Sequence, residues 1–375
     1  MDLQEKVQSL TQDARFDVCA PGNATGFFGE DHRRWIAATV LAGGREEHHL
    51  KMPLSNACEQ DCAYCANRNG RSFRRTSFEP EELARAFHQM WSSGLVTGLF
   101  LSSVVRGSSV RTMEREIVSV EILRTKYSFR GYVHLKLMPG TDRATVERAM
   151  ELADRVSVNL EAPKPGRLAR LTGKKDFYHE LLTPLRWVNE IRERRGPGIL
   201  RSGSTTQFVV GASGESDEEI LITVSQLYGQ LGLARAYYSA LRPVVDTPLQ
   251  DHAATTAIRE RRLYQSDFLL RHYGFRLQDL TFVECGNLPT ETDPKTLTAL
   301  RQAERFPVEI NSASREDMLR VPGIGPRSAE HILHIRRQGA LRSLGDLARA
   351  GASASRAAPF ILLDGRQPPT QPRLI

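Results

Sequence analysis

The sequence predicts an α/β fold built on a parallel sheet, followed by a small helical segment that is rich in arginine. Two observations predict the sheet. Short apolar runs rich in β-branched residues recur from about residue 48 onward, and stretches with helical periodicity separate them. Strands that alternate with helices in this way pair in parallel and are joined by crossover helices. The pattern alone fits an open doubly wound sheet and a curved partial barrel equally well.

Six strands and five intervening helices follow from this pattern. The strands are expected over residues 50–54, 98–105, 132–138, 155–160, 206–211 and 236–241. The helices are expected over residues 79–93, 113–127, 142–153, 177–194 and 217–231. A longer helix over residues 254–273 carries an apolar stripe that should pack against the sheet. In such sheets, the side chains that act on ligands collect at the carboxyl ends of the strands.

Length and composition place the chain among folded globular proteins. It has 375 residues, of which 40% are hydrophobic, which is enough for two or three domains. No stretch is long and apolar enough to cross a membrane, and the N-terminus lacks the pattern of a secretory signal. Five cysteines, three of them in one short run, are not a disulfide framework and fit a reducing compartment. We therefore expect a cytoplasmic protein with no membrane partner.

Three cysteines lie within eight residues, in the run Cys58-Glu-Gln-Asp-Cys62-Ala-Tyr64-Cys65. An iron-sulfur cubane that only carries electrons is bound by four thiolates, so three thiolates from one loop leave one iron open. A catalytic zinc ion keeps an open position in the same way, and an open iron therefore indicates chemistry at this site. The alternative is a structural zinc site completed by His48 and His49, although zinc normally takes its ligands as pairs from two separate segments.

The Cys-x3-Cys-x2-Cys spacing, with the aromatic Tyr64 before the last cysteine, resembles the signature of the radical S-adenosylmethionine (SAM) enzymes. The resemblance implies that Cys58, Cys62 and Cys65 bind three irons of a [4Fe-4S] cluster, and that SAM chelates the fourth. One electron from the cluster then cleaves SAM to methionine and a 5'-deoxyadenosyl radical that abstracts hydrogen from a substrate. An external electron donor such as flavodoxin or ferredoxin is implied. So is a (β/α)6 partial TIM barrel whose first strand leads into the cysteine loop.

The same resemblance implies SAM contacts near the ends of two strands. Ser102 and Ser103 follow the second strand, at the position where the family contacts the SAM amino group, often through a Gly-Gly-Glu type motif. This chain has serines and no acid there. Asn159 and Glu161 alternate at the end of the fourth strand, at the position that binds the ribose hydroxyls or the methionine end of SAM. A polar rim without a ligand is the alternative for these two residues, because such alternation is common.

The fifth strand and the third strand supply further candidates. Gln207 and Gly211 lie in a segment that resembles the family's Gly-x-Ile-x-Gly-x-x-Glu element, where main chain receives adenine, and Gln207 replaces the first glycine. Tyr64 is expected beside the cofactor. His134 and Lys136 alternate on the third strand and can face the barrel interior, either as functional groups or as structural ones.

A second motif lies near the C-terminus, in the run Val-Pro-Gly323-Ile324-Gly325-Pro-Arg327-Ser328 between two predicted short helices. The two glycines present unhindered backbone N–H groups at a helix N-terminus, which is a geometry that binds phosphate. The run resembles a helix-hairpin-helix DNA-binding motif, which contacts the backbone without reading sequence. The expected contacts are Gly323, Ile324, Gly325, Arg327 and Ser328, with Arg336, Arg337 and Arg342 as supplementary candidates. A hairpin used for protein contact is the alternative.

The charge distribution supports a polyanionic partner. The net charge is +7, and the chain from residue 301 onward has 12 arginines and no lysine against 7 acidic residues. A basic segment of this kind binds nucleic acid through its phosphates. The chain is thus expected to contain an N-terminal extension (1–45), a radical SAM core (46–250), a helical connection on the barrel (251–300), an all-α helix-hairpin-helix domain (301–365) and a flexible tail (366–375).

Together, the two motifs resemble the radical SAM proteins associated with DNA modification or repair. We therefore expect an enzyme that cleaves SAM and acts on nucleic acid, with DNA as the leading partner. One alternative keeps this chemistry but places the substrate on RNA or protein, with the hairpin as a docking module. The other is a non-enzymatic iron-sulfur protein that binds DNA, in which Cys19 or Cys285 supplies the missing cluster ligand.

Overall fold

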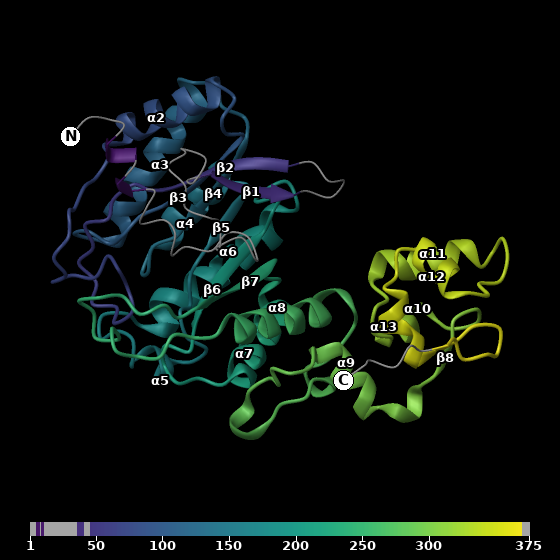
Figure 1. The fold of residues 1–375 in the computed structure, drawn as a ribbon. Coiled ribbons are helices and arrows are strands. Elements are labelled where there is room, and N and C mark those ends of the chain that lie inside the picture. The colour runs from purple at the N-terminus through teal and green to yellow at the C-terminus, as the bar shows by residue number, and fades with distance from the viewer. Residues whose placement is uncertain (1–4, 8, 11–35, 41–45, 370–375) are drawn as a thin grey trace. The chain divides into compact units, whose positions relative to one another are not determined.

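The computed structural model describes residues 5–7, 9–10, 36–40 and 46–369. The chain forms two compact units, which Figure 1 shows as one ribbon. The barrel unit contains residues 1–215 and 226–256, and the C-terminal unit contains residues 216–225 and 257–375. The predicted boundaries of the five sequence segments stay a prediction.

A sheet of seven strands forms the centre of the barrel unit. Its strands lie in the order β1-β2-β3-β4-β5-β6-β7, and β2 to β7 are all parallel. A doubly wound sheet reverses its strand order at one point, whereas this order never reverses. The sheet is therefore a partial barrel of six parallel strands with β1 added at one edge. The bounds are β1 Ile36–Val40, β2 Glu46–Pro53, β3 Gly98–Ser102, β4 Tyr132–Lys136, β5 Arg155–Ser157, β6 Ser204–Val210 and β7 Arg235–Ala240. All six predicted strands are confirmed.

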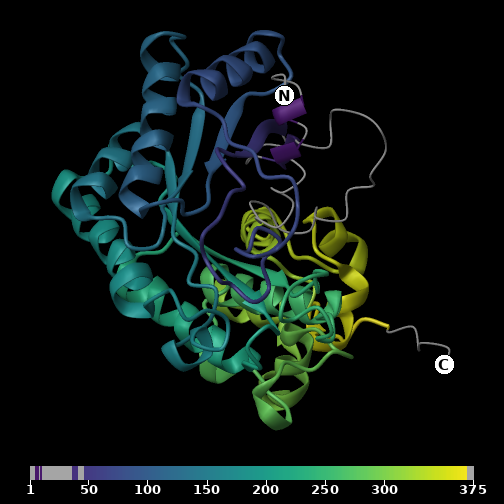
Figure 2. The ribbon, with the colours of Figure 1, turned by 90° about the vertical axis from the view of Figure 1, so that its left-hand side faces the viewer.

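The helices that connect these strands cover one face of the sheet, as Figure 2 shows. Right-handed crossovers between neighbouring parallel strands place every connecting helix on the same side. The side chains of Ser108 and Asp142 start α3 and α4 by accepting backbone N–H groups at 3.1 and 3.0 Å. The bounds are α2 Pro80–Ser92, α3 Ser109–Thr125, α4 Arg143–Leu152, α5 Pro165–Leu168, α6 Thr183–Arg195 and α7 Asp217–Leu231, with the π-helical turn η3 Phe177–Leu182 leading into α6.

The strands are buried on both faces, as expected for a parallel sheet. Every residue of β3 and β6 is buried. The predicted helices over 79–93, 113–127, 142–153, 177–194 and 217–231 are confirmed with small shifts at their ends. No helix in the described ranges is long and apolar enough to cross a membrane.

The N-terminal extension contributes a strand that the sequence pattern did not predict. Residues Ile36–Val40 pair antiparallel with β2, with Ile36 opposite Leu50. Five residues with two alanines and a threonine give too weak a strand signal to identify alone. Residues 5–7 and 9–10 are helical, in agreement with a short N-terminal helix. Cys19 lies outside the described residues.

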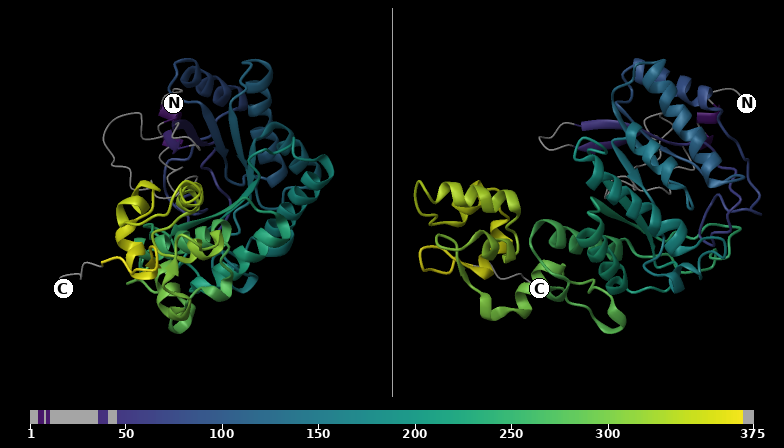
Figure 3. Two further views of the ribbon diagram at one scale, coloured as in Figure 1. Left: turned by 90° about the vertical axis from the view of Figure 1, so that its right-hand side faces the viewer. Right: turned by 180° about the vertical axis from the view of Figure 1, so that it is seen from behind.

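The C-terminal unit is built mostly from short helices, and Figure 3 gives two further views of it. The predicted helix over 254–273 is confirmed as α8 Ala257–His272, and its packing against the sheet stays a prediction. The expectation of a purely helical segment is wrong, because β8 Val308–Glu309 and β9 Ile361–Leu362 pair in parallel. Strands of two residues leave no period-2 pattern to detect. The remaining helices are α9 Pro294–Arg301, α10 Arg315–Arg320, α11 Pro326–Ile335, α12 Leu344–Arg349 and α13 Ala354–Ala357, with 3₁₀ turns at Leu277–Asp279, Glu284–Gly286, Ala303–Arg305 and Ala358–Phe360.

Residues 310–363 share one apolar core within the C-terminal unit. Ile324, at the centre of the Gly-Ile-Gly run, is 1% exposed and belongs to this core. The other fully buried members are Ile310, Met318, Val321, Ala329, Ile332, Leu341, Leu347, Ala350, Ala357 and Ile361. The turn that carries the second motif is therefore held by the packing of its own isoleucine.

Candidate functional site

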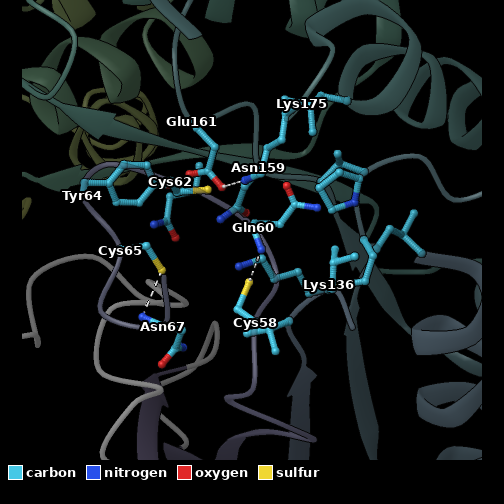
Figure 4. Close-up of a pocket in the computed structure, with 18 residues that line it drawn as sticks. Cys58, Gln60, Cys62, Tyr64, Cys65, Asn67, Lys136, Asn159, Glu161 and Lys175 are labelled. Atoms are coloured by element: carbon cyan, nitrogen blue, oxygen red, sulfur yellow. Dashed lines mark hydrogen bonds and ion pairs between the residues drawn. The ribbon is translucent and has the colours of Figure 1, made fainter. Parts of the chain in front are cut away.

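One cavity at the carboxyl ends of the strands brings the three cysteines together (Figure 4). The loop with Cys58, Cys62 and Cys65 follows β2, and the cavity contains about 830 Å³ of empty space. Volumes of this size accommodate small-molecule ligands. The other lining residues are Gln60, Tyr64, Asn67, Val104, Val105, Lys136, Leu137, Met138, Pro139, Val158, Asn159, Glu161, Lys175, Leu181 and Gln207.

Two of the three sulfur atoms accept backbone hydrogen bonds from the loop itself. The N–H groups of Gln60 and Asn67 donate to Cys58 Sγ and Cys65 Sγ, each at 3.4 Å. Burial raises the pKa of the Cys58 thiol, and it raises the pKa of Cys65 to about 12. Buried thiols of this kind stay protonated without a cation, and a coordinated metal deprotonates them. A metal centre that binds these thiols therefore displaces their protons.

A segment that follows α5 holds the cysteine loop from outside. The carboxylate of Asp61 accepts the hydroxyl of Thr172 and, at 3.0 Å, the N–H of Gly173. The ammonium of Lys174 donates to the carbonyl of Glu59 at 2.9 Å. These contacts join residues more than 100 positions apart in the sequence, and they place Lys175 beside the cysteines.

A buried cluster of charged and polar groups faces the sulfur atoms. Lys175 Nζ lies 3.6 Å from Glu161 Oε1, and both side chains are more than nine-tenths buried. Burial lowers the pKa of Lys175, but the negative charges of Cys62 and Glu161 outweigh it, so the net shift is upward. Burial and the neighbouring charge of Glu161 raise the pKa of Tyr64, which also hydrogen-bonds Glu161. The cluster therefore holds an ammonium and a carboxylate as a pair next to Cys62.

The backbone at Glu161 is unusual. Its φ angle is +63°, in the left-handed region that non-glycine residues seldom adopt. Its N–H donates to the carbonyl of Gln207 at 3.0 Å, and its carbonyl accepts the N–H of Val209 at 2.9 Å. These two hydrogen bonds to β6 stabilise a conformation that directs the Glu161 side chain into the cavity, where Figure 4 shows it. Strain of this kind is concentrated at functional sites.

Four of the residues predicted to bind SAM line the cavity: Tyr64, Asn159, Glu161 and Gln207. Ser102, Ser103 and Gly211 are not among its lining residues. The carbonyl of Ser102 accepts the N–H of Leu54 at 2.7 Å, and the N–H of Gly211 donates to Glu215. Contacts of these three residues with a cofactor stay predictions.

The structure adds four residues to the site beyond those predicted to bind the cluster or SAM. Lys136 was expected to face the interior, and it lines the cavity. Lys175, Gln60 and Asn67 line it as well and were not predicted. Gln60 and Asn67 lie within the cysteine loop and were detectable from their positions. Lys175 lies in a loop without periodicity, so only the tertiary fold identifies it.

The structure places the two candidate zinc-ligating histidines away from the cysteines. His49 pairs with Gly98 in the first half of β2, where its ring stacks on Tyr132 with ring centres 4.7 Å apart. A strand rises about 3.3 Å per residue, so His49 lies on the order of 13 Å before the end of β2. The zinc site with His48 and His49 is therefore wrong.

Cys285, the other free thiol of the described chain, is exposed and belongs to the C-terminal unit. Its φ angle is +64° within a short 3₁₀ turn. Ligation of the cluster by Cys285 or Cys19 stays a prediction.

In the C-terminal unit, the second motif forms a tight turn between α10 and α11. Gly323 has a φ angle of +87°, and a Cβ at this position would lie 2.5 Å from the carbonyl oxygen of Ser353. Its own carbonyl accepts the Ser353 N–H at 2.8 Å. Gly325 is the N-cap of α11, and Pro326 occupies the first helical position. Only glycine fits at 323, and the turn leaves the first amides of α11 outside the helical hydrogen-bond ladder.

Some polar side chains around this turn form hydrogen bonds to the backbone, and others are exposed. Arg327 is exposed in the first turn of α11. The hydroxyl of Ser328 donates to the carbonyl of Gly351 at 2.7 Å. The group that Ser328 can offer to a ligand at the start of α11 is therefore its backbone N–H. Arg336 donates to the carbonyl of Ala313 at 2.6 Å, so this supplementary candidate stabilises the hairpin from inside. Arg337 and Arg342 are exposed, in keeping with the remaining supplementary candidates.

A buried lysine lies beneath the turn. Lys295 Nζ donates to the carbonyl of Ile324 at 2.5 Å and lies 4.6 Å from the centre of the Tyr273 ring. Burial, followed by the positive charge of Arg356, lowers the pKa of Lys295 to about 7. The hydrogen bond fixes the backbone of the Gly-Ile-Gly run from below.

Comparison with known proteins points to one superfamily. A family model described as the Radical SAM superfamily matches residues 52–227. A comparison with functionally curated proteins found no match. The match covers the end of β2, the strands β3 to β6, the cysteine loop and all the cavity-lining residues.

Three solved structures show distant similarity to the chain. HydG, a maturase of the [FeFe]-hydrogenase, is 13% identical over 58% of this chain and 48% of that chain, with a TM-score of 0.46. HydG from Carboxydothermus hydrogenoformans is 16% identical over 58% of this chain and 50% of that chain, with a TM-score of 0.42. Methylornithine synthase (PylB) is 14% identical over 72% of this chain and 76% of that chain, with a TM-score of 0.48. The chain thus spans about half the length of the two HydG proteins.

Proposed function

We propose that this chain, whose residues 52–227 match the Radical SAM superfamily model, cleaves S-adenosylmethionine at a [4Fe-4S] cluster, and that its substrate is nucleic acid, specifically DNA. The observation that carries this proposal is the α10–α11 hairpin, whose glycine turn presents backbone amides at the start of a ten-residue helix. The cavity with the three cysteines lies in the barrel unit, and the hairpin lies in the C-terminal unit. The chain therefore combines a radical-generating site with a segment suited to hold a polyanion.

The residues of the cavity fit the cluster and its cofactor. Cys58, Cys62 and Cys65 supply three thiolates from one loop, and two of the sulfur atoms already accept N–H groups, as cluster thiolates do. Once bound, the cluster supplies the electron that cleaves SAM to a 5'-deoxyadenosyl radical. The three thiolates leave one iron for SAM, which agrees with the free space beside them.

The protein's own side chains orient the cofactor and exclude water. The carboxylate of Glu161 is an acceptor for hydrogen bonds from a cofactor in the cavity, and it forms an ion pair with Lys175 at 3.6 Å. Asn159 and Gln207 supply amide groups for the hydroxyls of a ribose. Apolar residues cover much of the remaining wall, which keeps a reactive radical away from solvent: Val104, Val105, Leu137, Met138, Pro139, Val158 and Leu181.

The hairpin supports DNA as the partner on three grounds. The amides of Gly325, Arg327 and Ser328 lie at the positive end of the α11 dipole, where phosphate binds. Exposed Arg327 adds a charge beside them. The arginine excess from residue 301 onward favours phosphate over a neutral protein surface. Since contacts of this kind do not read sequence, the target is chosen by the barrel site. A base that is unpaired or already extruded reaches such a site with the lowest free-energy cost of unstacking and unpairing.

Two experiments test this function. Anaerobic turnover with SAM, a reductant and a panel of DNA and RNA substrates should give 5'-deoxyadenosine and a nucleoside of changed mass. A protein with Cys58, Cys62 and Cys65 all replaced by Ala should lose its iron-sulfur absorption and all 5'-deoxyadenosine. Turnover that leaves every nucleoside unchanged but modifies a protein would reassign the substrate.

Binding across a salt series tests the hairpin separately. Affinity for duplex DNA should fall steeply with salt, and Arg327→Gln should reduce the slope of log K against log salt by about 1. Tighter binding to structured RNA than to DNA would transfer the proposal to RNA. Arg85→Gln, which removes an exposed arginine of α2 in the barrel unit, is the matched control for charge.

A further inference from the structure

A single guanidinium closes the loop that carries the three cysteines. The two terminal nitrogens of Arg75 lie within hydrogen-bond distance of five backbone carbonyl oxygens: those of Asn56 (3.3 Å), Cys58 (3.3 Å), Asn67 (3.4 Å), Arg68 (2.7 Å) and Arg71 (3.3 Å). The half-buried guanidinium also lies 4.4 Å from the centre of the Phe73 ring.

These carbonyls belong to two stretches of the chain, one at each end of the cysteine motif. Asn56 and Cys58 lie at the start of the cysteine motif, and the other three carbonyls follow Cys65. Arg75 therefore ties the two ends of the loop together around all three cysteines. The base of the loop is closed independently by the hydrogen bond from the Asn56 N–H to the Thr76 carbonyl at 3.2 Å.

Only arginine can make this closure. Its planar guanidinium carries five N–H donors in a fixed fork, so one group can serve carbonyls on two sides. A lysine at the same position has the same charge but presents it as a single point. The carbonyl oxygens of the loop point toward the Arg75 guanidinium. Backbone N–H groups of the same loop can therefore point toward the sulfur atoms, as those of Gln60 and Asn67 do.

We propose that Arg75 is a positioning residue that holds Cys58, Cys62 and Cys65 in their binding arrangement before iron arrives. A flexible loop loses conformational entropy when three of its residues bind one cluster. A loop that is already closed loses less, so its affinity for the cluster is higher. The proposal requires the cluster but no particular substrate, so a failure to modify DNA leaves it untouched.

The test compares Arg75→Lys and Arg75→Gln with Arg74→Gln. Arg74 is the adjacent, exposed arginine, and within the described ranges only its backbone carbonyl, which accepts from Asn56 Nδ2, takes part in a hydrogen bond. The first measurement uses the protein without iron. The rates at which iodoacetamide alkylates Cys58 and Cys65 are followed by peptide mass spectrometry under anaerobic conditions. The second measurement is the rate at which the reconstituted protein loses iron to a chelator.

We expect both Arg75 variants to increase alkylation and iron loss roughly tenfold or more, because several charged hydrogen bonds are lost together. Arg74→Gln should match the wild type in both. Hydrogen exchange in peptides from β3 and β6 establishes that the barrel is folded, and if Arg75→Gln does not fold, Arg75→Lys decides alone. Wild-type rates in Arg75→Lys would overturn the proposal, since charge would then suffice without the fork.

Discussion

Replacing Lys295 by Met should remove a pH dependence from the stability of the C-terminal unit. The side chain is 8% exposed, and its pKa is lowered from 10.5 to about 7 by burial and by the charge of Arg356. Asp293 opposes this shift and Arg320 adds to it. Either the ammonium or the neutral amine can donate to the Ile324 carbonyl, so that hydrogen bond does not reverse the direction.

The direction of the stability change follows from the two pKa values. Between pH 7 and pH 10.5 the unfolded chain binds the Lys295 proton and the folded chain releases it. The free energy of unfolding therefore rises with pH across this interval and is nearly flat below it. For a shift of this size, the rise is about 1 kcal/mol from pH 7 to pH 8 and about 2 to 3 kcal/mol from pH 6 to pH 9.

The assay must report on the C-terminal unit alone. Trp91 and Trp187, the tryptophans of the described ranges, belong to the barrel unit, so their fluorescence does not follow the C-terminal unit. Native-state hydrogen exchange does, if peptides from residues 310–363 are followed at several pH values and corrected for intrinsic rates. Peptides from β6 in the same samples are the internal control, and they should show the same profile in both proteins.

The comparison of wild type with Lys295→Met cancels every other titrating group. Met is unbranched and apolar and is one atom shorter than lysine, so it preserves most of the packing on Tyr273. The difference between the two proteins should change by about 1 kcal/mol per pH unit just above pH 7 and should level off below pH 6. Parallel profiles for wild type and variant, or a difference of opposite slope, would refute the idea that burial controls this lysine.

Two further substitutions have defined outcomes. Glu161→Gln removes the charge that faces Lys175 and keeps the shape of the side chain. The affinity for SAM, measured by equilibrium binding, should fall roughly ten- to a hundredfold while the iron content stays unchanged. An unaltered affinity would exclude Glu161 as a cofactor ligand. Gly323→Ala places a Cβ 2.5 Å from the Ser353 carbonyl at a φ of +87°, and it should destabilise peptides from residues 310–363 by about 2 to 4 kcal/mol in hydrogen exchange. Gly339→Ala, where nothing lies within 4 Å of the added atom, is its control and should be nearly neutral; equal losses in both would contradict the steric reasoning.

The fold was predictable because its signals are local. Most of the parallel strands contain a short apolar run, and several helices begin at a capping residue such as Ser108 or Asp142. The cysteine motif is local as well, since its spacing lies within eight residues. The elements that escaped prediction are short or weakly patterned, such as β1 and the β8–β9 pair, whose hydrogen bonds depend on a partner strand elsewhere in the chain.

The surroundings of the cysteines were much less predictable than the cysteines themselves. Lys175 reaches the site from a loop more than 100 residues away from Cys62, and no periodicity marks it. Arg75 is close in sequence, but its role depends on how the loop folds back over it. The ligands of a site can therefore be read from spacing, whereas the groups that set its charge and rigidity come from tertiary contacts.

Glu161 shows how a correct residue can follow from an incomplete argument. Alternation along a strand over residues 155–160 predicted that Asn159 and Glu161 share a face, yet β5 ends at Ser157. Beyond that point period-2 alternation no longer determines direction. Glu161 has a positive φ angle, and hydrogen bonds to Gln207 and Val209 stabilise this backbone conformation. In this conformation the Glu161 side chain lines the cavity. Because this conformation is costly without those partners, the left-handed backbone is itself evidence that the position of this carboxylate matters.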